Sequence, residues 1–305
     1  MIDLLLLNMK DKKPNKINVL EFMSRFNTDD KCLDYLFTLK YGLGKIKCEA
    51  CNKQATFHKI SGRKCYSCSN CGSHIYPLAN TIFHKSRTPL RKWFYAMYLF
   101  STSKNGVAGK ELERQLGVTY KTAWRIAKQI RLLFKQGSDM LSGTVEVDET
   151  YIGGLEKNKH ANKKTEGNQG RSNKTKTPVV GVVERDGKII ARVTQDTKSS
   201  TVKPLIKANV KMGSTVMTDE YLGYRGINKE GYKHEKVNHG AKEYVNGDTH
   251  TNNLEGFWSQ LKRSINGTYH AVSAKYLQIY VNEFAYRYNH RSSQKHLFDL
   301  MVELV

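Results

Sequence analysis

The sequence predicts an α/β protein whose strand-rich domain follows a cysteine-rich segment and a helical segment. Three observations lead to this prediction. Five of the six cysteines lie between residues 48 and 71, and residues 88–135 repeat apolar side chains at helical spacing. From residue 143 onward, β-branched runs alternate with helical stretches, which indicates a mixed sheet with helices packed on it. A chain of 305 residues suits about two domains.

The charge balance points to a polyanionic partner. The chain carries 50 Lys and Arg against 28 Asp and Glu, a formal net charge of +22. Nucleic acid is the leading partner for such a chain. The longest aliphatic run, residues 4–7, is too short to cross a membrane, and Asp3 argues against a secretory signal. We therefore expect a cytoplasmic, nucleoid-associated protein with no membrane partner.

The order of patterns along the chain suggests four segments. We expect an N-terminal helical segment at 1–44, a metal-binding segment at 45–80, a DNA-binding helical region at 81–140 and a catalytic domain at 141–305. Thr28 and the two aspartates after it should cap a helix inside the first segment. Strands are expected at 144–148, 178–183, 189–193 and 214–219, and later helices at 202–210, 251–266, 273–289 and 296–304. Residues 155–177 have no apolar period and are interpreted as a mobile basic loop.

Two CxxC pairs separated by 16 residues predict a structural zinc site. Each pair offers two thiolates, and four protein ligands complete a tetrahedral zinc without an open position for substrate. Cys65 leaves an alternative, because Cys65 and Cys68 are also spaced as CxxC. Cys71 fits better, since a glycine follows it as in a metal-binding turn. The expected ligands are Cys48, Cys51, Cys68 and Cys71.

Residues 111–125 have the pattern of a helix-turn-helix. Leu112 and Leu116 should face inward, Gly117 should form the turn, and Thr119 should cap the second helix. Trp124, Ile126 or Ala127, and Ile130 are expected to form its buried stripe. The opposite face would then meet a DNA groove or phosphates through Tyr120, Lys121, Thr122, Arg125 and Lys128. An ordinary helical hairpin with a solvated basic face remains the alternative.

Three acidic residues lie where a metal-dependent nuclease needs them. Asp148 and Asp219 each end a predicted strand, and Glu255 lies in a predicted helix. Phosphodiester cleavage with two divalent ions requires hard oxygen ligands brought together from separate elements. Lys262 falls two turns after Glu255 on the same helical face, where it could contact a phosphate. Glu149 and Glu220 adjoin the aspartates and should point away, although the pattern alone does not exclude them.

Basic residues near the C-terminus are candidates for phosphate contacts. Arg263 follows Lys262, and Arg287 and Arg291 are one helical turn apart in an aromatic-rich helix. The alternative is a core helix whose arginines extend along apolar surface to reach water.

Several of these motifs together resemble the insertion-sequence transposases of the DDE group that have an N-terminal zinc ribbon and an ISXO-type catalytic domain. The resemblance runs from about residue 20 to 292. Besides the CxxC pairs, the motifs that carry it are Leu116-Gly-Val-Thr-Tyr-Lys-Thr-Ala-Trp-Arg, Val147-Asp-Glu-Thr-Tyr-Ile-Gly-Gly, Thr218-Asp-Glu, His250-Thr-Asn-Asn-Leu-Glu-Gly-Phe-Trp and Glu283-Phe-Ala-Tyr-Arg-Tyr-Asn.

The resemblance implies an RNase H-like mixed-sheet catalytic domain preceded by a small zinc ribbon and a helix-turn-helix. It implies Asp148, Asp219 and Glu255 as ligands of two Mg²⁺ or Mn²⁺ ions, with Lys262 as the accompanying basic residue. Asn252 and Asn253 remain alternatives for the third ligand.

The resemblance also implies a reaction and its partners. The enzyme would hydrolyse double-stranded DNA at the terminal inverted repeats of the element and join the freed 3′-OH to target DNA. It would act as a homodimer or a larger synaptic assembly. The alternatives are a DNA-binding regulator with an inactive transposase remnant, an RNase H-fold nuclease without strand transfer, and a zinc-stabilised scaffold.

Overall fold

The computed structural model describes residues 17–137, 139–154, 160–164, 175–236 and 251–305. The chain forms two compact units, one of residues 1–133 and 293–305 and the other of residues 134–292. We expected a boundary near residue 140, with residues 293–305 in the catalytic domain. In the structure these last residues belong to the N-terminal unit.

The described part of the N-terminal unit contains six helices, four of which meet in an aromatic core. They are α2 (Val19–Arg25), α3 (Asp29–Tyr41), α4 (Leu90–Thr102), α5 (Gly109–Leu116), α6 (Tyr120–Leu133) and α10 (Leu297–Glu303). Phe298 of α10 is fully buried, with its ring centroid 5.4 Å from those of Phe22 and Phe26 and 5.8 Å from that of Phe94. This apolar contact holds the end of the chain in the first unit. Thr28 accepts a hydrogen bond from the backbone N–H of Lys31 at 3.2 Å and so caps α3 as expected.

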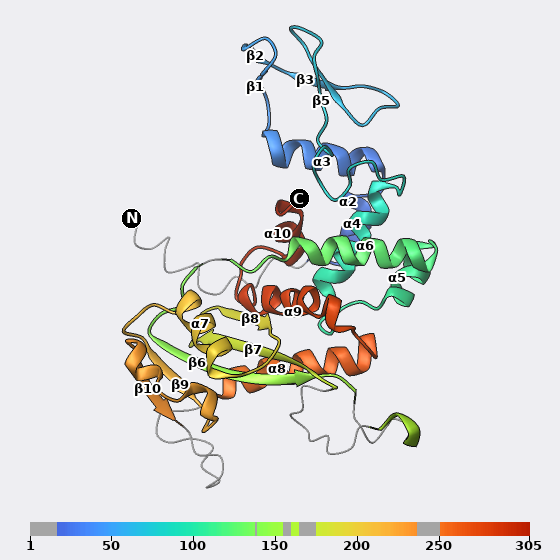
Figure 1. Ribbon diagram of the computed structural model, residues 1–305. Helices are drawn as coiled ribbons and strands as arrows, with labels where there is room; N and C mark the ends of the chain where they lie inside the picture. The colour runs from blue at the N-terminus through green and yellow to red at the C-terminus, as the bar shows by residue number, and fades with distance from the viewer. Residues whose placement is uncertain (1–16, 138, 155–159, 165–174, 237–250) are drawn as a thin grey trace. The chain divides into compact units, whose positions relative to one another are not determined.

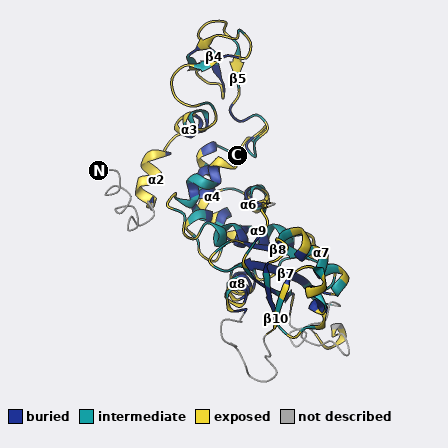
Figure 2. Ribbon diagram, turned by 90° about the vertical axis from the view of Figure 1, so that its left-hand side faces the viewer, coloured by how far each residue is buried: buried dark blue, intermediate teal, exposed yellow. Residues whose placement is uncertain are grey.

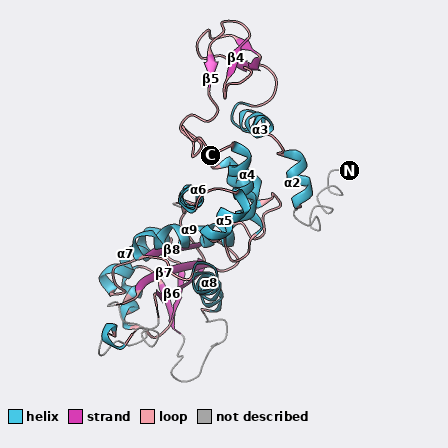
Figure 3. Ribbon diagram, turned by 90° about the vertical axis from the view of Figure 1, so that its right-hand side faces the viewer, coloured by secondary structure: helices cyan, strands magenta, loops and turns pink. Residues whose placement is uncertain are grey.

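Short strands between α3 and α4 form the cysteine-rich segment (Figure 3). Strands β1 (Ile46–Lys47) and β2 (Gln54–Ala55) pair antiparallel, as do β3 (Phe57–Lys59), β4 (Tyr66–Cys68) and β5 (His74–Ile75) in a second sheet. The ring of Phe37 in α3 stacks on that of Tyr66 with centroids 4.1 Å apart, and the Tyr66 hydroxyl donates to Asp34. These contacts attach the second of these sheets to α3.

A five-stranded mixed sheet forms the centre of the second unit (Figure 1). Its strands are β6 (Thr144–Ile152), β7 (Thr177–Glu184), β8 (Ile189–Val193), β9 (Thr215–Thr218) and β10 (Lys233–Lys236), in the order β10-β9-β6-β7-β8. Strands β6, β7 and β8 are antiparallel, whereas β9 is parallel to both β6 and β10. The first four strands were expected. Strand β10 was not, because its residues are mainly polar and exposed.

Helices cover both faces of this sheet. The long helices α8 (Asn252–Arg263) and α9 (Ala274–Asn289) share one apolar cluster with the sheet, and α7 (Ser199–Asn209) shares another on the opposite face. A π-helical segment, η6 (Ser264–Tyr269), joins α8 to α9. Single-turn 3₁₀ helices lie at Ala161–Lys163, Leu222–Tyr224 and Ile227–Glu230. Figure 2 shows the buried interior of the central strands. The α/β class and the RNase H-like mixed sheet are thus confirmed.

Side-chain amides protect the outer edge of β8. The backbone N–H groups of Ile189, Ala191 and Val193 each donate at 2.7 Å to an amide oxygen, from Asn289, Gln136 and Gln278 respectively. An edge strand normally presents unpaired backbone groups to other chains. Here side-chain amides accept hydrogen bonds from these backbone groups, so they occupy the positions that another chain would use. Asn289, at the end of the aromatic motif, therefore has a structural partner.

The expected basic loop at 155–177 lies mostly outside the described residues. Within it, Ala161–Lys163 forms the short 3₁₀ helix, and Thr177 already belongs to β7. In the described part of the chain, no helix combines the length and the hydropathy needed to span a membrane.

Candidate functional site

A cavity of about 730 Å³ brings together the residues that the sequence singled out. It is lined by residues of β6, of the segment that follows β9, and of α8. Asp148, Asp219, Glu255 and Lys262 all line it, and so do Glu149 and Glu220. The structure therefore groups in one cavity residues that are up to 114 positions apart in the sequence.

Asp148 is fixed by a close approach of α8 to the sheet. It lies inside β6, which continues to Ile152, and it pairs with Gly181 of β7. A Cβ atom on Gly181 would lie 2.6 Å from the Trp258 ring, so only glycine allows α8 this close. The Trp258 indole N–H donates to the Asp148 carboxylate at 3.0 Å. Gly181 thereby permits the contact that orients Asp148.

Asp148 occupies an electrostatically unfavourable position. Burial, together with the negative charges of Glu149 and Asp219, raises its pKa from 3.8 to about 7. Like charges held together in a cavity are stabilised by a bound cation, and carboxylate oxygens are the ligands that Mg²⁺ and Mn²⁺ prefer. The donor set of this cavity therefore fits divalent metal ions.

Glu149 lies on the other face of β6, as alternation predicts, yet it is buried and lines the same cavity. The hydroxyl of the fully buried Tyr224 donates to its carboxylate at 2.6 Å. Burial and the negative charge of Glu149 raise the pKa of Tyr224 well above its usual value, so this phenol keeps its proton and remains a donor. The hydrogen bond with Tyr224 gives Glu149 a structural role, which the sequence pattern had left open.

A buried carboxylate that sequence analysis missed holds the start of α8. Glu146 of β6 is completely buried, and its oxygens accept the backbone N–H groups of Asn253 and Leu254 at 3.1 and 3.3 Å. The Asn253 side-chain amide donates to the same carboxylate at 2.8 Å, and Arg185 lies 3.4 Å away. Negative charge at a helix N-terminus is favourable. Glu146 thus connects the strand of Asp148 to the helix of Glu255.

The three candidates for the third metal ligand differ in their contacts. Asn253 binds Glu146 and is not among the residues that line the cavity, and neither is Asn252. Glu255 lies exposed in the first turn of α8 and does line it. Asp219 follows the last residue of β9, where its carboxylate accepts the backbone N–H of Tyr221 at 3.0 Å. This contact fixes the turn after the strand.

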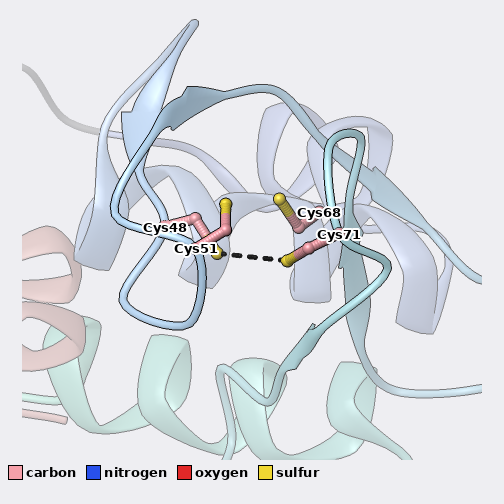
Figure 4. A group of neighbouring side chains, drawn as sticks. All are labelled: Cys48, Cys51, Cys68 and Cys71. Atoms are coloured by element: carbon pink, nitrogen blue, oxygen red, sulfur yellow. Dashed lines mark hydrogen bonds between the residues drawn. The ribbon is translucent and has the colours of Figure 1, made fainter.

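The two CxxC pairs form a compact group of four thiols (Figure 4). The sulfur atoms of Cys48, Cys51, Cys68 and Cys71 all lie within 4.8 Å of one another. Cys48 Sγ and Cys71 Sγ are 3.8 Å apart, and sulfurs bound 2.3 Å from a tetrahedral zinc lie about 3.8 Å apart. Cys65 is buried outside this group. The four cysteines therefore fit a structural zinc, and no other group of three or more potential ligands is this compact among the described residues.

Each cysteine pair lies in the same kind of turn. The N–H of Asn52 donates to the carbonyl of Cys48 at 2.8 Å, and that of Gly72 donates to the carbonyl of Cys68 at 3.0 Å. Both donors have a positive φ, 56° for Asn52 and 72° for Gly72. Hydrogen bonding with Ser73 lowers the pKa of Cys48 to about 6 and also lowers that of Cys71. At these two cysteines it favours the thiolate, the form that binds zinc. Burial and hydrogen bonds with the other thiols raise the pKa of Cys51 to about 11.

The pair α5–α6 has the expected local geometry. Gly117 ends α5 with φ 56° and ψ 54°, and the N–H of Thr122 donates to the Thr119 hydroxyl at 3.4 Å. Leu112 and Leu116 are buried as expected. The buried stripe of α6 consists of Ala123, Ile126, Ala127 and Ile130, whereas Trp124 is only half-buried, with Lys128 Nζ 5.5 Å from its ring centroid.

Of the residues expected to face DNA on α6, Tyr120, Lys121 and Arg125 are exposed, and Thr122 and Lys128 are half-buried. Arg125 is exposed but also donates to the Thr88 hydroxyl at 3.1 Å.

The arginines of α8 and α9 differ in their surroundings. Arg287 was expected to contact phosphates, but its side chain is 15% exposed and pairs at 3.0 Å with the fully buried Glu283. This ion pair favours the alternative of a core helix, because a buried carboxylate needs such a partner. Exposed Arg291 donates to the carbonyls of Gly187 and Tyr288 at 3.0 and 2.9 Å. Exposed Arg263 donates to Ser259 at 3.3 Å.

Comparison with known proteins agrees with this geometry. Residues 140–289 match the ISXO2-like transposase domain, and residues 27–74 match the transposase zinc-ribbon domain. The chain is similar to an uncharacterized protein in transposable element ISH50 of Halobacterium salinarum, with 26% identity over 86% of this chain and 91% of the relative. It is also similar to an uncharacterized transposase-like protein of Haemophilus influenzae, with 25% identity over 39% of this chain and 94% of the relative. The chain thus contains an ISXO2-like transposase domain preceded by a transposase zinc-ribbon domain.

Proposed function

We propose that this protein is a DNA transposase that cuts the ends of its insertion sequence and joins them to target DNA. The observation that carries the proposal is the cavity shared by Asp148, Asp219, Glu255 and Lys262 within the ISXO2-like domain. The three carboxylates come from strand β6, from the turn that directly follows β9, and from helix α8 packed on the sheet, which suits ligands that must keep a fixed spacing.

Each group has a distinct role in the proposed reaction. The three carboxylates hold two Mg²⁺ or Mn²⁺ ions, with the Trp258 indole orienting Asp148 and Tyr221 restraining Asp219. Divalent ions bound there supply activation of the attacking oxygen and stabilisation of the leaving oxygen. Lys262 contacts the DNA phosphate beside them. Cleavage by water frees a 3′-OH, which then attacks a target phosphodiester in line, without a covalent link to the protein.

The N-terminal unit is proposed to recognise the DNA. Helix α6 presents Tyr120, Lys121 and Arg125 at its exposed surface, with Thr122 and Lys128 beside them. These side chains suit base edges and phosphates in the major groove. The zinc ribbon contributes further contacts to the terminal inverted repeats, and Arg263 is a phosphate contact near the active site. Two DNA ends must be held together, so we propose a homodimer or larger assembly working on DNA of the nucleoid.

The test uses linear DNA ending in the repeats that flank the gene. Wild-type protein and Asp219→Ala are incubated with it, with and without Mg²⁺, and new 3′ ends are mapped. Nicks at the repeat boundary that require both Mg²⁺ and Asp219 are expected. Glu21→Ala, an exposed substitution outside the cavity that also removes a carboxylate, serves as the control for the change in charge.

The other outcomes identify the alternatives. Repeat binding without nicks would indicate a regulator with an inactive remnant. Nicks scattered without regard to the repeats would indicate a general nuclease, and binding insensitive to DNA sequence without a Mg²⁺-dependent product would indicate a scaffold.

A further inference from the structure

A second cavity adjoins the carboxylate cavity, and Lys262 lines both. The second cavity has a volume of about 490 Å³. It lies between the end of β6, the residue that precedes β7, and the π-helical segment η6. Two cavities that share a side chain can hold consecutive parts of one extended ligand.

The two cavities differ in charge. Among the described residues, the carboxylate cavity is lined by five acidic residues and by one cation, Lys262. The second cavity is lined by Lys176, Lys262 and His270, and no carboxylate lines it among the described residues. An anionic phosphate is therefore repelled by the first cavity when no cation is bound there, and attracted by the second.

The walls of the second cavity also offer apolar surface. Ile152 and Ile265 are 6% and 5% exposed, and half-buried Tyr151 also lines the cavity. Aliphatic and aromatic side chains beside cations match a nucleotide, whose sugar and base are less polar than its phosphate. A free inorganic phosphate would leave this apolar surface unused.

An unusual backbone forms one wall of the cavity, and a buried network holds it. Segment η6 is π-helical, and His270 after it has φ 60° and ψ −47°, outside the regions that non-glycine residues favour. The Tyr269 hydroxyl lies 3.3 Å from a carboxylate oxygen of the fully buried Glu283, which also binds Arg287. Strained backbone of this kind persists where surrounding contacts enforce it, commonly at ligand sites.

Gly153 keeps the opposite wall close to the start of β7. A Cβ atom at this position would lie 2.8 Å from the carbonyl oxygen of Thr175 and 3.0 Å from Lys176 Cγ. The absence of a side chain lets the end of β6 pack against Lys176, which is half-buried at the cavity wall.

We propose that this second cavity binds the nucleotide adjacent to the scissile phosphate in the strand being cut. Its phosphate contacts Lys176 and His270, and its sugar and base lie against Ile152, Ile265 and Tyr151. Lys262, shared by the cavities, lies between this nucleotide and the reacting one. The inference rests on the proposed function, because it places the DNA strand relative to the carboxylate cavity.

The experiment combines two protein variants with single methylphosphonate substitutions in the DNA. A methylphosphonate removes the negative charge of one phosphate, and it is scanned over two positions on each side of the cleavage site. Lys176→Gln keeps the aliphatic stem beside Gly153 but removes the charge. Lys275→Gln makes the same change at an exposed position of α9 that lines neither cavity.

Loss of one charge-assisted contact should slow nicking of unmodified DNA by Lys176→Gln about tenfold. At one flanking position, a methylphosphonate should slow the wild type by a similar factor and Lys176→Gln no further. Lys275→Gln should behave as the wild type at every position. Equal rates for Lys176→Gln and wild type, or additive losses at all positions, would overturn the inference while leaving Asp219-dependent cleavage intact.

A binding measurement separates this inference from the proposed function. Affinity for the same DNA is measured with Ca²⁺ in place of Mg²⁺, so that no cleavage is needed. If wild type fails to cut but Lys176→Gln still loses affinity in the same position-dependent way, the transposase proposal fails and the nucleotide site stands. If neither cleavage nor affinity depends on Lys176 at any position, the nucleotide site is refuted.

Discussion

Replacement of Gly181 by alanine tests the close contact between α8 and the sheet. The new methyl group would lie 2.6 Å from Trp258 Cζ2 and 2.8 Å from Leu254 Cδ2. Carbon atoms need about 3.5 Å, so α8 must move by about 0.9 Å. Because Leu254 and Trp258 are 0% and 4% exposed, neither ring nor methyl group has room to turn aside. Overpacking of this kind costs about 1–3 kcal/mol.

The net effect on stability follows from two opposing terms. Alanine leaves the unfolded chain less conformational freedom than glycine does. This effect raises the free energy of unfolding by about 0.4–1 kcal/mol. We therefore expect Gly181→Ala to lower the free energy of unfolding by about 1–2 kcal/mol. The same movement displaces Trp258 from Asp148 and shifts Glu255, and a 1 Å error in a reacting group lowers the rate on the order of 100-fold.

The assays are urea unfolding of the full chain and Mg²⁺-dependent nicking of repeat-ended DNA. Gly256→Ala, on the same helix, is the matched control. A Cβ atom there meets no atom within 4 Å, so alanine should stabilise α8 by about 0.5–1 kcal/mol through helix propensity. If Gly181→Ala retained both wild-type stability and wild-type nicking, the contact would not position Asp148 and the reasoning would be refuted.

Three further predictions follow from the two sites. Cys71→Ser should abolish the bound zinc measured by metal analysis while Cys65→Ser retains it, and equal zinc in both would contradict the ligand assignment. In metal-free protein the pKa of Asp148 is raised from 3.8 to about 7, so the folded state holds a proton that the unfolded state has lost. The free energy of unfolding should then fall between about pH 4 and pH 7 by up to about 1.4 kcal/mol per pH unit, and Asp148→Asn should flatten this slope in urea titrations. Tyr224→Phe should cost about 1–3 kcal/mol, because it removes the hydrogen bond that the buried Tyr224 hydroxyl donates to Glu149, and an unchanged urea midpoint would contradict that role.

Local spacing was sufficient to predict the features whose chemistry depends on neighbouring residues. The CxxC pairs predicted the four-thiol group, and Gly117 and Thr119 predicted the turn before α6. Each of these features is formed within a few residues, so the sequence alone shows its parts. Periodicity alone did not predict that Asp148, Asp219 and Glu255 lie together. That prediction came from the resemblance of their motifs to those of a known family.

Features that depend on tertiary partners were missed. Glu146 is one polar position in an alternating strand, and only its contact with the start of α8 reveals its role. Strand β10 was missed because it lies at the sheet edge and exposes Lys and Glu side chains, which lack an apolar period. For Arg287 a signal was present, since Glu283 precedes it by four residues, a spacing that favours ion pairs within a helix.

The position of α10 in the first unit affects how this protein is made. The first unit contains residues on both sides of the second unit, and its aromatic core is complete only when Phe298 has been added. A chain that stops before residue 293 therefore leaves Phe22, Phe26 and Phe94 without that partner, even if every residue of the carboxylate cavity has been made. The ribosome must therefore add the segment that follows the second unit before the first unit can fold to completion, so a product shortened before that segment does not yield an intact first unit.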